Sequence, residues 1–151
     1  NAIGSKNIYI INKTIVSSLK IIFTFALVAA IPLLIFPTYT IEFFFSNLTS
    51  SDKLLQYAAL ALIGSWLFFL FDGLTWVYAA ILTAGGDTKF IMLISAVNSW
   101  FFAGLPLLLF VDKATEPYVP WMLILPFYSI LNWLCCFLRY KYGKWRQKLD
   151  L

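Results

Sequence analysis

The sequence predicts an all-α integral membrane protein, built as a polytopic bundle of four transmembrane helices. Composition is the first reason, because 62% of the 151 residues are hydrophobic and 12% are charged, whereas soluble domains average about 45–50% and about 25%. The spacing of the charges is the second reason. It leaves four windows of at least the roughly 20 residues that a helix needs to cross a bilayer. These windows predict helices near residues 16–36, 56–84, 90–111 and 118–139.

The first helix follows from residues 21–41, which carry no charge. Pro32 lies inside this helix, and Pro106 and Pro126 lie inside the third and fourth helices. Each proline lacks the amide hydrogen that a helix uses. We therefore expect an ordinary kink at each position, with neighbouring helices or water satisfying the freed carbonyl.

The second helix follows from residues 54–86, which contain a single charge, Asp72. The preceding segment, 41–52, starts with an apolar run too short to span a membrane, so we expect it to lie along the interface. Its last three residues are candidates for the N-cap of the second helix, because their side chains can accept a hydrogen bond from the first helical amides. They are Ser50, Ser51 and Asp52.

The third and fourth helices follow from residues 90–111 and 117–138, which carry no charge. Between the second and third helices the sequence predicts a tight, glycine-rich loop in water. Its motif is Gly85, Gly86, Asp87 and Thr88. The connection 112–120 is polar and contains prolines, so it also lies outside hydrocarbon. Residues 140–151 form a basic tail.

Lysine and arginine are far more numerous at one end of the predicted helices than at the other. Nine fall at one end: Lys6, Lys13, Lys20, Lys89, Arg139, Lys141, Lys144, Arg146 and Lys148. Only Lys53 and Lys113 fall at the other end. Loops that stay in the cytoplasm carry an excess of these residues. We therefore expect a multi-pass protein of the cell (inner or plasma) membrane, with both ends of this segment in the cytoplasm.

Missing residue types argue against several classes of function. The sequence has no histidine, the commonest general base and metal ligand. Cys135 and Cys136 are adjacent and form no CxxC pair, so we expect them to pack as small hydrophobic residues. There is no GxxxxGK[ST] phosphate loop. We expect neither enzymatic activity nor a cofactor. Basic residues flank apolar runs instead of sharing one surface, so we expect no nucleic-acid partner.

Asp72 is the candidate functional residue of the membrane interior. It lies two residues past the midpoint between Lys53 and Asp87, which at about 1.5 Å per residue is close to the bilayer centre. A carboxylate there costs roughly 2.5–3.5 kcal/mol on insertion scales unless it meets water, a cation or a partner group. Such residues commonly mark ion or substrate pathways.

Helical periodicity places six further residues on the side of the second helix that carries Asp72. They combine hydroxyl groups, aromatic rings and a small side chain: Ser65, Phe68, Thr75, Trp76, Ala79 and Thr83. The opposite stripe is aliphatic and suits lipid: Ile63, Leu67, Leu70, Leu74, Val77 and Ile81. The polar face predicts a wet cavity in which Asp72 binds a cation or proton and the other six residues line a substrate pathway. The alternative is a neutral carboxyl that hydrogen-bonds a neighbouring helix and has only a structural role.

Two asparagines are the other strongly polar side chains within the predicted spans. Asn98 and Asn132 lie in the third and fourth helices. Each amide can form a hydrogen bond between helices, and such bonds contribute about 0.6–2 kcal/mol in membranes. We expect this structural role for both, although either could join Asp72 in binding an ion.

An intramembrane aspartate, a helix of small and hydroxylated residues and a Gly-Asp-Thr turn follow one another in residues 71–90 (FDGLTWVYAAILTAGGDTKF). This stretch resembles the tenth helix and following loop of multidrug and toxic compound extrusion (MATE) transporters. The fifteen positions from Asp72 to Asp87 are similar to the NorM-type branch. Residues 41–57, 100–106 and 142–146 resemble the family's outer connection, eleventh helix and basic tail.

The resemblance implies that residues 1–151 are a fragment, the last four of twelve helices and the C-terminal part of a MATE-type lobe. It implies a cation-coupled multidrug efflux antiporter that works by alternating access. Asp72 matches the carboxylate implicated in coupling to Na⁺ or H⁺, and a Na⁺ site there is the only metal site we expect. The implied partners are the lipid bilayer, small amphipathic or cationic substrates and the remaining eight helices, which include a second acid.

Two other functions remain open at this point. A flippase for lipid-linked oligosaccharides has the same architecture, but it favours cationic residues facing the cavity. Few cations lie within the predicted membrane spans, only Lys20 near the end of one. A four-helix membrane scaffold is the alternative from another class. In a scaffold, Asp72 would only pair with a neighbouring helix.

Overall fold

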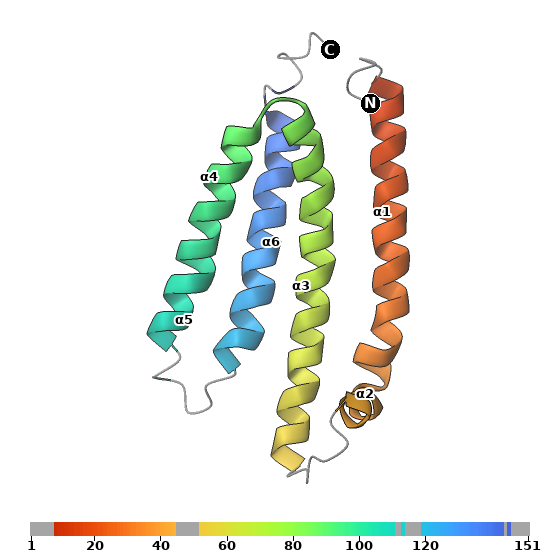
Figure 1. The fold of residues 1–151 in the computed structure, drawn as a ribbon, viewed down its shortest axis with the longest axis vertical. Helices are drawn as coiled ribbons and strands as arrows, with labels where there is room; N and C mark the ends of the chain where they lie inside the picture. The colour runs from red at the N-terminus through yellow and green to blue at the C-terminus, as the bar shows by residue number, and fades with distance from the viewer. Residues whose placement is uncertain (1–7, 45–51, 111–112, 114–118, 144, 146–151) are drawn as a thin grey trace.

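The structure is a computed structural model in which every regular element is a helix. It describes residues 8–44, 52–110, 113, 119–143 and 145. Within these residues four helical segments are long and apolar enough to cross a membrane. They are Tyr9–Ile35, Lys53–Ala84, Thr88–Phe110 and Met122–Tyr142. The four segments run side by side in Figure 1 and confirm the predicted fold class.

The first span combines helix α1 (Ile8–Ala30) with a π-helical turn, η1 (Ile31–Ile35). Pro32 lies in that turn. Its carbonyl oxygen accepts a hydrogen bond from the Thr40 hydroxyl at 2.6 Å. Thr40 belongs to α2 (Pro37–Phe44), a short helix that Figure 1 shows end-on, across the direction of the four spans. The chain therefore changes direction shortly after Pro32, from along the membrane span to across the end of the bundle. The Thr40 hydroxyl satisfies the Pro32 carbonyl at this point.

The second span is α3 (Asp52–Ala84), the longest helix, with 33 residues. At about 1.5 Å per residue it is roughly 50 Å long, so it exceeds the roughly 30 Å hydrocarbon core. Asp52 is its first residue, whereas the other two cap candidates, Ser50 and Ser51, lie outside the described residues. Because α3 is this long, its middle third lies in hydrocarbon even when both ends extend into the headgroups.

The third span consists of α4 (Thr88–Asn98), a second π-helical turn η2 (Ser99–Gly104) and α5 (Leu105–Phe110). The amide of Leu105 donates to the carbonyl of Trp100, five residues back. Pro106, which has no amide hydrogen, follows directly. The wider turn thus lies on the N-terminal side of the proline, where an α-helical carbonyl would lose its partner.

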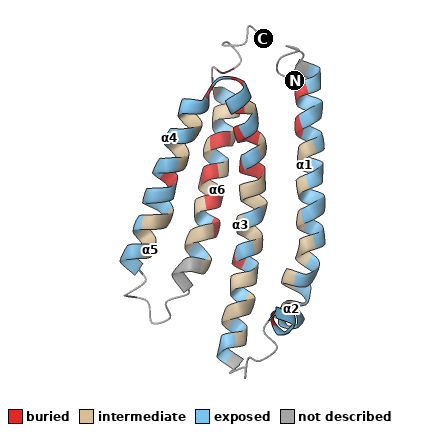
Figure 2. Ribbon diagram, viewed as in Figure 1, coloured by how far each residue is buried: buried red, intermediate tan, exposed pale blue. Residues whose placement is uncertain are grey.

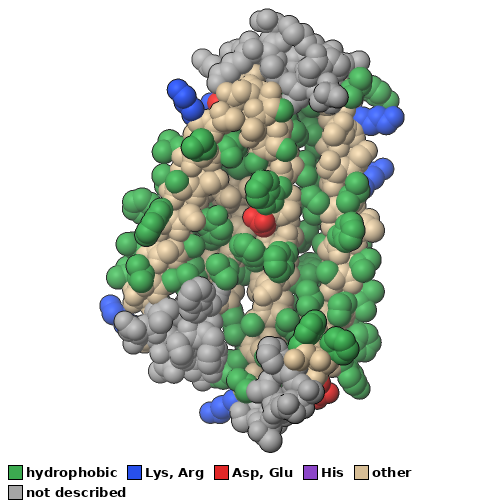
Figure 3. Space-filling model, in the orientation of Figure 1, with side chains coloured by type: hydrophobic (Ala, Val, Ile, Leu, Met, Phe, Trp, Pro, Cys, Tyr) green, Lys and Arg blue, Asp and Glu red, His purple; other side chains and the backbone are tan. Residues whose placement is uncertain are grey.

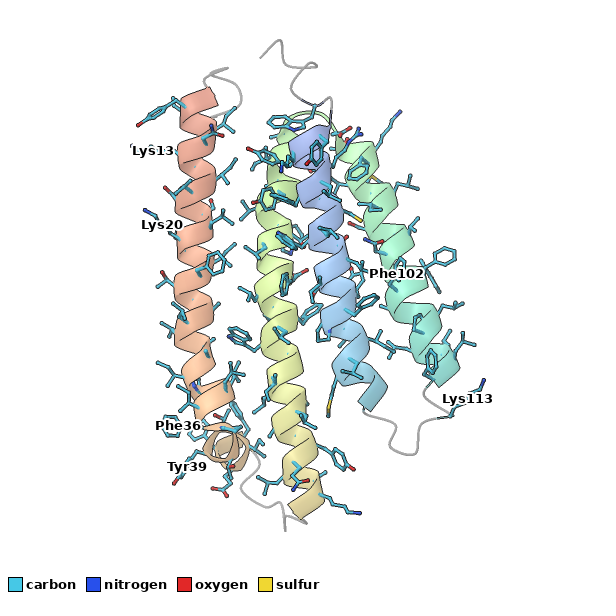
Figure 4. The ribbon with its side chains drawn as sticks, turned by 180° about the vertical axis from the view of Figure 1, so that it is seen from behind. Lys13, Lys20, Phe36, Tyr39, Phe102 and Lys113 are labelled. Carbon is cyan, nitrogen blue, oxygen red and sulfur yellow. The ribbon has the colours of Figure 1, made fainter. Side chains whose placement is uncertain are left out.

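The fourth span is α6 (Val119–Tyr142), which contains Pro126. The buried hydroxyl of Ser129 donates to the Pro126 carbonyl at 2.8 Å. Among the described elements, α6 makes its largest contact with α3 and also touches α4, η2 and α5. One such contact joins the rings of Phe102 in η2, labelled in Figure 4, and Phe127, with centroids 6.4 Å apart. The fourth span is therefore the centre of a three-helix unit.

The core lies between α3 and α6. Figure 2 shows the buried residues gathered on these two helices, mostly toward the end where the α3–α4 loop lies. Leu82 and Cys136 are fully buried there. The ring of Tyr78 packs against those of Phe137 and Tyr140, with centroids 5.4 and 5.3 Å away. Cys135 and Cys136 are free thiols within α6, as expected for small packing residues.

Helix α1 packs on α3 more loosely. The indole nitrogen of Trp66 donates to the Ala26 carbonyl at 2.8 Å and links the two helices. Around this bond lies a cavity of about 340 Å³, lined by hydrophobic side chains of both helices. A Cβ added at Gly73 would meet Ile22 of α1 at 3.4 Å, an ordinary contact distance. The first span is therefore a peripheral helix beside a compact unit of α3, α4 and α6.

Three details of the sequence prediction were wrong. Helix α1 begins at Ile8 instead of near residue 16, and α3 begins at Asp52 instead of near residue 56. Charged residues mark where a chain leaves hydrocarbon, but a helix can continue into water. Leu74, assigned to a lipid-facing stripe, is 7% exposed, because the rear of α3 lies between α1 and α6.

Candidate functional site

Asp72 lies midway along α3 with its carboxylate half-buried. Its Oδ2 accepts a hydrogen bond of 3.0 Å from the indole Nε1–H of Trp76, one helical turn further on. No other hydrogen bond to this carboxylate comes from the described residues. The partner lies on the same helix, so the bond links no second helix to Asp72. The carboxylate thus keeps one oxygen free of any described donor.

The face of α3 that carries Asp72 is open. Figure 3 shows acidic atoms midway along α3, surrounded by hydrophobic side chains and uncovered toward the viewer. Trp76 is 69% exposed, and Ser65 and Thr83 are also exposed. Figure 1 shows α6 on one side of α3 and α1 on the other, and both helices contact α3. Four of the predicted residues therefore share one accessible face.

Two of the predicted cavity residues are buried instead. Thr75 and Ala79 are 6% and 8% exposed. Thr75 is turned about 60° from Asp72 around the helix axis. It continues a stripe that includes Phe71 and Tyr78, whose rings contact α6. The Thr75 hydroxyl donates to the Phe71 carbonyl at 2.8 Å, so its hydrogen-bonding capacity is used within α3. Both side chains contribute to the core of the described unit.

Phe68 and Ser65 line a cavity of about 310 Å³ between α3 and α6. The α6 side of the cavity is formed by Met122, Leu125 and Pro126. It begins one turn before Asp72 in α3 and extends toward the start of that helix. The cavity therefore brings an aromatic ring and a hydroxyl together beside the carboxylate, in a mostly apolar space that suits part of an amphipathic molecule.

The α3–α4 loop has a well-defined backbone geometry. The amide of Asp87 donates to the Leu82 carbonyl at 2.8 Å, and that of Gly86 donates to the Thr83 carbonyl at 3.0 Å. These two bonds define a Schellman motif, which needs a residue with positive φ after the helix. Gly86 fills that position with φ 79°. The loop glycine therefore ends α3 and directs the chain into α4, which begins at Thr88.

Asp87 forms the main ion pair of this loop, and its partner was not predicted from the sequence. The Nε of Arg139 donates to its Oδ2 at 2.7 Å, and Nη2 donates to Oδ1 at 3.2 Å. The Asp87 side chain is 6% exposed, and the guanidinium also lies over the Phe90 ring at 4.8 Å. This bidentate ion pair joins the loop to the end of α6, 52 residues later.

Trp145 packs on the same loop. A Cβ added at Gly85 would lie 3.0 Å from the Trp145 ring, closer than an ordinary contact, so a larger residue would have to displace the ring. Trp145 is fully buried, donates to the Tyr140 carbonyl at 2.8 Å and stacks on the Tyr140 ring. The loop motif thus has a clear structural role. The one signal in the sequence was that the acid and the arginine fall at the same end of the predicted spans.

Asn98 and Asn132 link α4 to α6. Asn98 Nδ2 donates to Asn132 Oδ1 at 3.2 Å, and both residues are buried. This is the interhelical contact expected for them. Because the two amides bind each other and lie in the contact between α4 and α6, the structure does not bring them together with Asp72.

Comparisons with known proteins place the chain in a family. A family model described as MatE matches residues 1–108, more than two thirds of the chain. The matched region includes Asp72, its open face and the α3–α4 loop. No curated protein and no solved structure matches the chain.

Proposed function

Because this chain belongs to the MatE family of membrane transporters, we propose that it forms part of a cation-coupled efflux antiporter in which Asp72 binds the coupling ion. The members of this family are transporters and not enzymes. The proposal adds three features to that membership: coupling to Na⁺ or H⁺, small amphipathic or cationic substrates, and a role for one carboxylate in the exchange. The remaining eight helices would complete the transporter.

One observation carries the proposal. Asp72 is a half-buried carboxylate in the middle of a membrane span, and its one described hydrogen bond comes from Trp76 on its own helix. A structural carboxyl would be expected to bond a neighbouring helix. No described residue of another helix forms a hydrogen bond with Asp72.

The energetics support an ionic partner. A carboxylate in mid-membrane costs roughly 2.5–3.5 kcal/mol on insertion scales. A hydrogen bond to a charged group contributes about 1.5–3 kcal/mol, and less where the donor is as exposed as Trp76. The remaining cost is offset when the carboxylate binds a proton or a cation, or when it faces water. Because the free and the ion-bound carboxylate then differ little in free energy, Asp72 binds and releases the ion readily, as coupling requires.

Exchange follows from competition at this group. An ion or a cationic substrate that binds one conformation better than the other shifts the population toward that conformation. When the coupling ion occupies Asp72 from the outside, a cationic substrate loses its counter-charge and is released. The rings of Phe68 and Trp76 flank the carboxylate along α3 and provide surfaces for the apolar part or positive charge of a substrate.

The flippase and scaffold alternatives have less support. Membership of a transporter family favours transport over a scaffold role. A flippase for lipid-linked oligosaccharides would favour cationic residues in the cavity. Lys20 is the one described lysine well inside a span, and Figure 4 shows its side chain pointing away from the other helices. The described cavities of this chain are lined by apolar, aromatic and hydroxyl groups.

The test uses the full-length transporter reconstituted in vesicles, with Na⁺ and pH gradients imposed separately. Asp72→Asn should reduce ion-driven substrate transport by more than tenfold while leaving insertion and yield unchanged. Asp72→Glu keeps the charge and should retain part of the coupling. Thr38→Ala, which removes an exposed hydroxyl from α2 outside this site, is the control and should leave ion dependence unchanged. Equal ion-driven transport in the parent and Asp72→Asn proteins would disprove the proposal.

A further inference from the structure

The outer side of α1 presents a stripe with two lysines toward its start and apolar side chains toward its end. Lys13 and Lys20 are seven residues apart, so they lie on the same face of the helix. Figure 4 shows both side chains pointing away from the rest of the bundle. The stripe continues beyond Lys20 with exposed hydrophobic side chains. These are Phe23, Leu27 and Ile31.

The depth of the two lysines follows from the helix geometry. Ile35 ends the first span, and Phe36 and Tyr39 follow it as exposed aromatic residues, visible at that end in Figure 4. Such residues mark a membrane interface. At about 1.5 Å per residue, Lys20 lies roughly 22 Å from Ile35 and Lys13 roughly 33 Å. With a hydrocarbon core of about 30 Å, the two lysines lie on either side of the opposite boundary.

The charge of this pair has no described counterpart. Neither lysine forms an ion pair with a described residue, and α1 contains no acidic residue. The Lys20 backbone is satisfied locally, because the Thr24 hydroxyl donates to its carbonyl at 2.8 Å. Its ammonium group starts inside the hydrocarbon boundary and must reach outward along the helix to the headgroup layer. Two cations therefore meet at the depth of lipid phosphates, above a surface suited to acyl chains.

We propose that Lys13 and Lys20 bind the headgroup of an anionic phospholipid in the cytoplasmic leaflet, with its acyl chains lying on Phe23, Leu27 and Ile31. The leaflet assignment rests on the proposed orientation of the chain. Lipid is the occupant that fits this surface, because the stripe offers an upstream helix no polar side chain between Thr24 and Pro32, whereas the Asp72 face of α3 offers several. The two uncovered faces therefore have different partners, lipid on α1 and the rest of the transporter on α3.

The experiment measures lipid retention, which is independent of transport. The full-length protein is purified from vesicles of phosphatidylcholine with phosphatidylglycerol, and the lipid that it retains is identified by native mass spectrometry. A lysine near an anionic surface contributes about 1 kcal/mol. Lys20→Gln should therefore weaken phosphatidylglycerol retention roughly fivefold, and Lys13→Gln with Lys20→Gln should weaken it further. Lys20→Arg keeps the charge and should retain phosphatidylglycerol as the parent protein does.

Two control variants show whether the loss of lipid is specific to this pair of lysines. Lys113→Gln removes an exposed lysine at the opposite end of the bundle, labelled in Figure 4, and should leave retention unchanged. Asp72→Asn should also leave it unchanged, so a failure of the proposed transport mechanism is distinguishable from a failure of the lipid site. Equal retention by the double-lysine variant and the parent would overturn the proposal, as would displacement of the lipid by inorganic phosphate.

A second measurement tests whether lipid or protein covers the stripe. A fluorophore attached to Leu27→Cys, in a protein whose Cys135 and Cys136 are replaced by alanine, should be quenched by nitroxide-labelled acyl chains. The same fluorophore on Ala79→Cys, a buried position in α3, should be quenched much less. An unquenched signal at position 27 would show that an upstream helix covers α1 and would contradict the assignment to lipid.

Discussion

The hydrogen bond between Trp76 and Asp72 determines how the carboxylate behaves before an ion arrives. Trp76 Nε1 lies 3.0 Å from Asp72 Oδ2, and the hydrogen bond that it donates stabilises the ionised carboxylate. It therefore competes with any cation that seeks the same oxygen. Trp76 lies one turn from Asp72 on the same helix, so the indole and the cation compete for the carboxylate in every conformation of the transporter.

Removing the Trp76 donor should strengthen ion binding. Trp76→Phe keeps an aromatic ring but loses the N–H. Because Trp76 is exposed, its hydrogen bond contributes less than the about 1.5–3 kcal/mol of a buried one. At about 1 kcal/mol, the half-saturating concentration of the coupling ion should fall roughly fivefold. Ion-dependent transport by the full-length protein measures this value. Trp100→Phe, an exposed tryptophan on another helix, is the control and should leave it unchanged. A higher half-saturating concentration in Trp76→Phe would contradict the role given to the donor.

The Asp87–Arg139 pair should contribute to stability. Arg139→Gln removes the guanidinium that pairs with Asp87, a carboxylate of 6% exposure. The expected loss is roughly 2 kcal/mol, less than the about 3–5 kcal/mol of a fully buried pair, because Arg139 itself is 35% exposed. Thermal unfolding of the purified protein measures the effect. The double variant Asp87→Asn with Arg139→Gln should lose less than the sum of the single changes, and strictly additive losses would show that the pair is not coupled.

At the residue scale the sequence predicted one of these two interactions in part. The depth of Asp72 in the membrane stays a prediction from the spacing of the charges. Helical periodicity predicted the face that it shares with Trp76, although Thr75 and Ala79 of that face are buried. The donor Trp76 was placed on the same face, but its bond depends on a side-chain rotamer. The Asp87–Arg139 pair joins residues 52 positions apart. In the sequence, Asp87 and Arg139 each indicated only where a span ends. Their pairing depends on how α3, α4 and α6 pack together.

At the scale of helices, a close approach of backbones holds α3 against α6. A Cβ on Gly64 would lie 2.9 Å from the Met122 carbonyl oxygen, too close for a side chain. Glycine at such a position lets helices in a membrane pack tightly, where van der Waals contact supplies much of the attraction. This contact also forms one wall of the cavity lined by Ser65 and Phe68.

Alanine at this position should destabilise the α3–α6 unit. Gly64→Ala forces the helices apart, and overpacking of this kind costs typically about 1–3 kcal/mol. Gly104→Ala is the matched control, because its nearest neighbour would be 3.5 Å away and alanine favours helix by up to about 1 kcal/mol. Thermal unfolding should therefore shift in opposite directions for the two variants. A Gly64→Ala protein as stable as the parent would show that the helices do not meet here as described.

The helices themselves were predictable, but their ends and their π-helical turns were not. Uncharged windows predicted all four spans because hydrocarbon excludes charge. The same windows placed the start of α1 too late, since Lys13 is compatible with helix in water. Pro32 and Pro106 predicted irregular backbone, yet the extra residue in each turn depends on local packing. The Thr40 hydroxyl, which bonds the Pro32 carbonyl, could not be assigned before α2 was seen to fold back.

At the scale of the whole molecule, both described ends of the chain lie at one end of the bundle. Figure 1 shows the start of α1, the α3–α4 loop and the end of α6 together. Lys13, Lys89 and Lys141 belong to that end, whereas Lys53 and Lys113 belong to the other. The distribution of basic residues predicted that these elements share one end of the bundle. From the positive-inside tendency we propose that this end faces the cytoplasm.

Thiol labelling tests this orientation. In a full-length protein with Cys135 and Cys136 replaced by alanine, Lys113→Cys should react with a membrane-impermeant maleimide on intact cells. Lys89→Cys should react only after the membrane is permeabilised. Both positions are exposed, so a difference in reactivity reports the side of the membrane and not burial. The reverse pattern would place the α3–α4 loop outside and would overturn both the orientation and the leaflet assigned to the lipid site.

The most direct test of the whole account is the release of the coupling ion when substrate binds. The purified full-length transporter, loaded with Na⁺ or protons, is mixed with a cationic substrate, and the ions that appear in solution are counted for each molecule of substrate bound. The parent protein should release the ion as substrate binds, because both compete for Asp72. Asp72→Asn lacks the counter-charge and should bind the cationic substrate more weakly, and at substrate concentrations high enough for binding it should release no ion. Equal release for each bound substrate from both proteins would contradict the account.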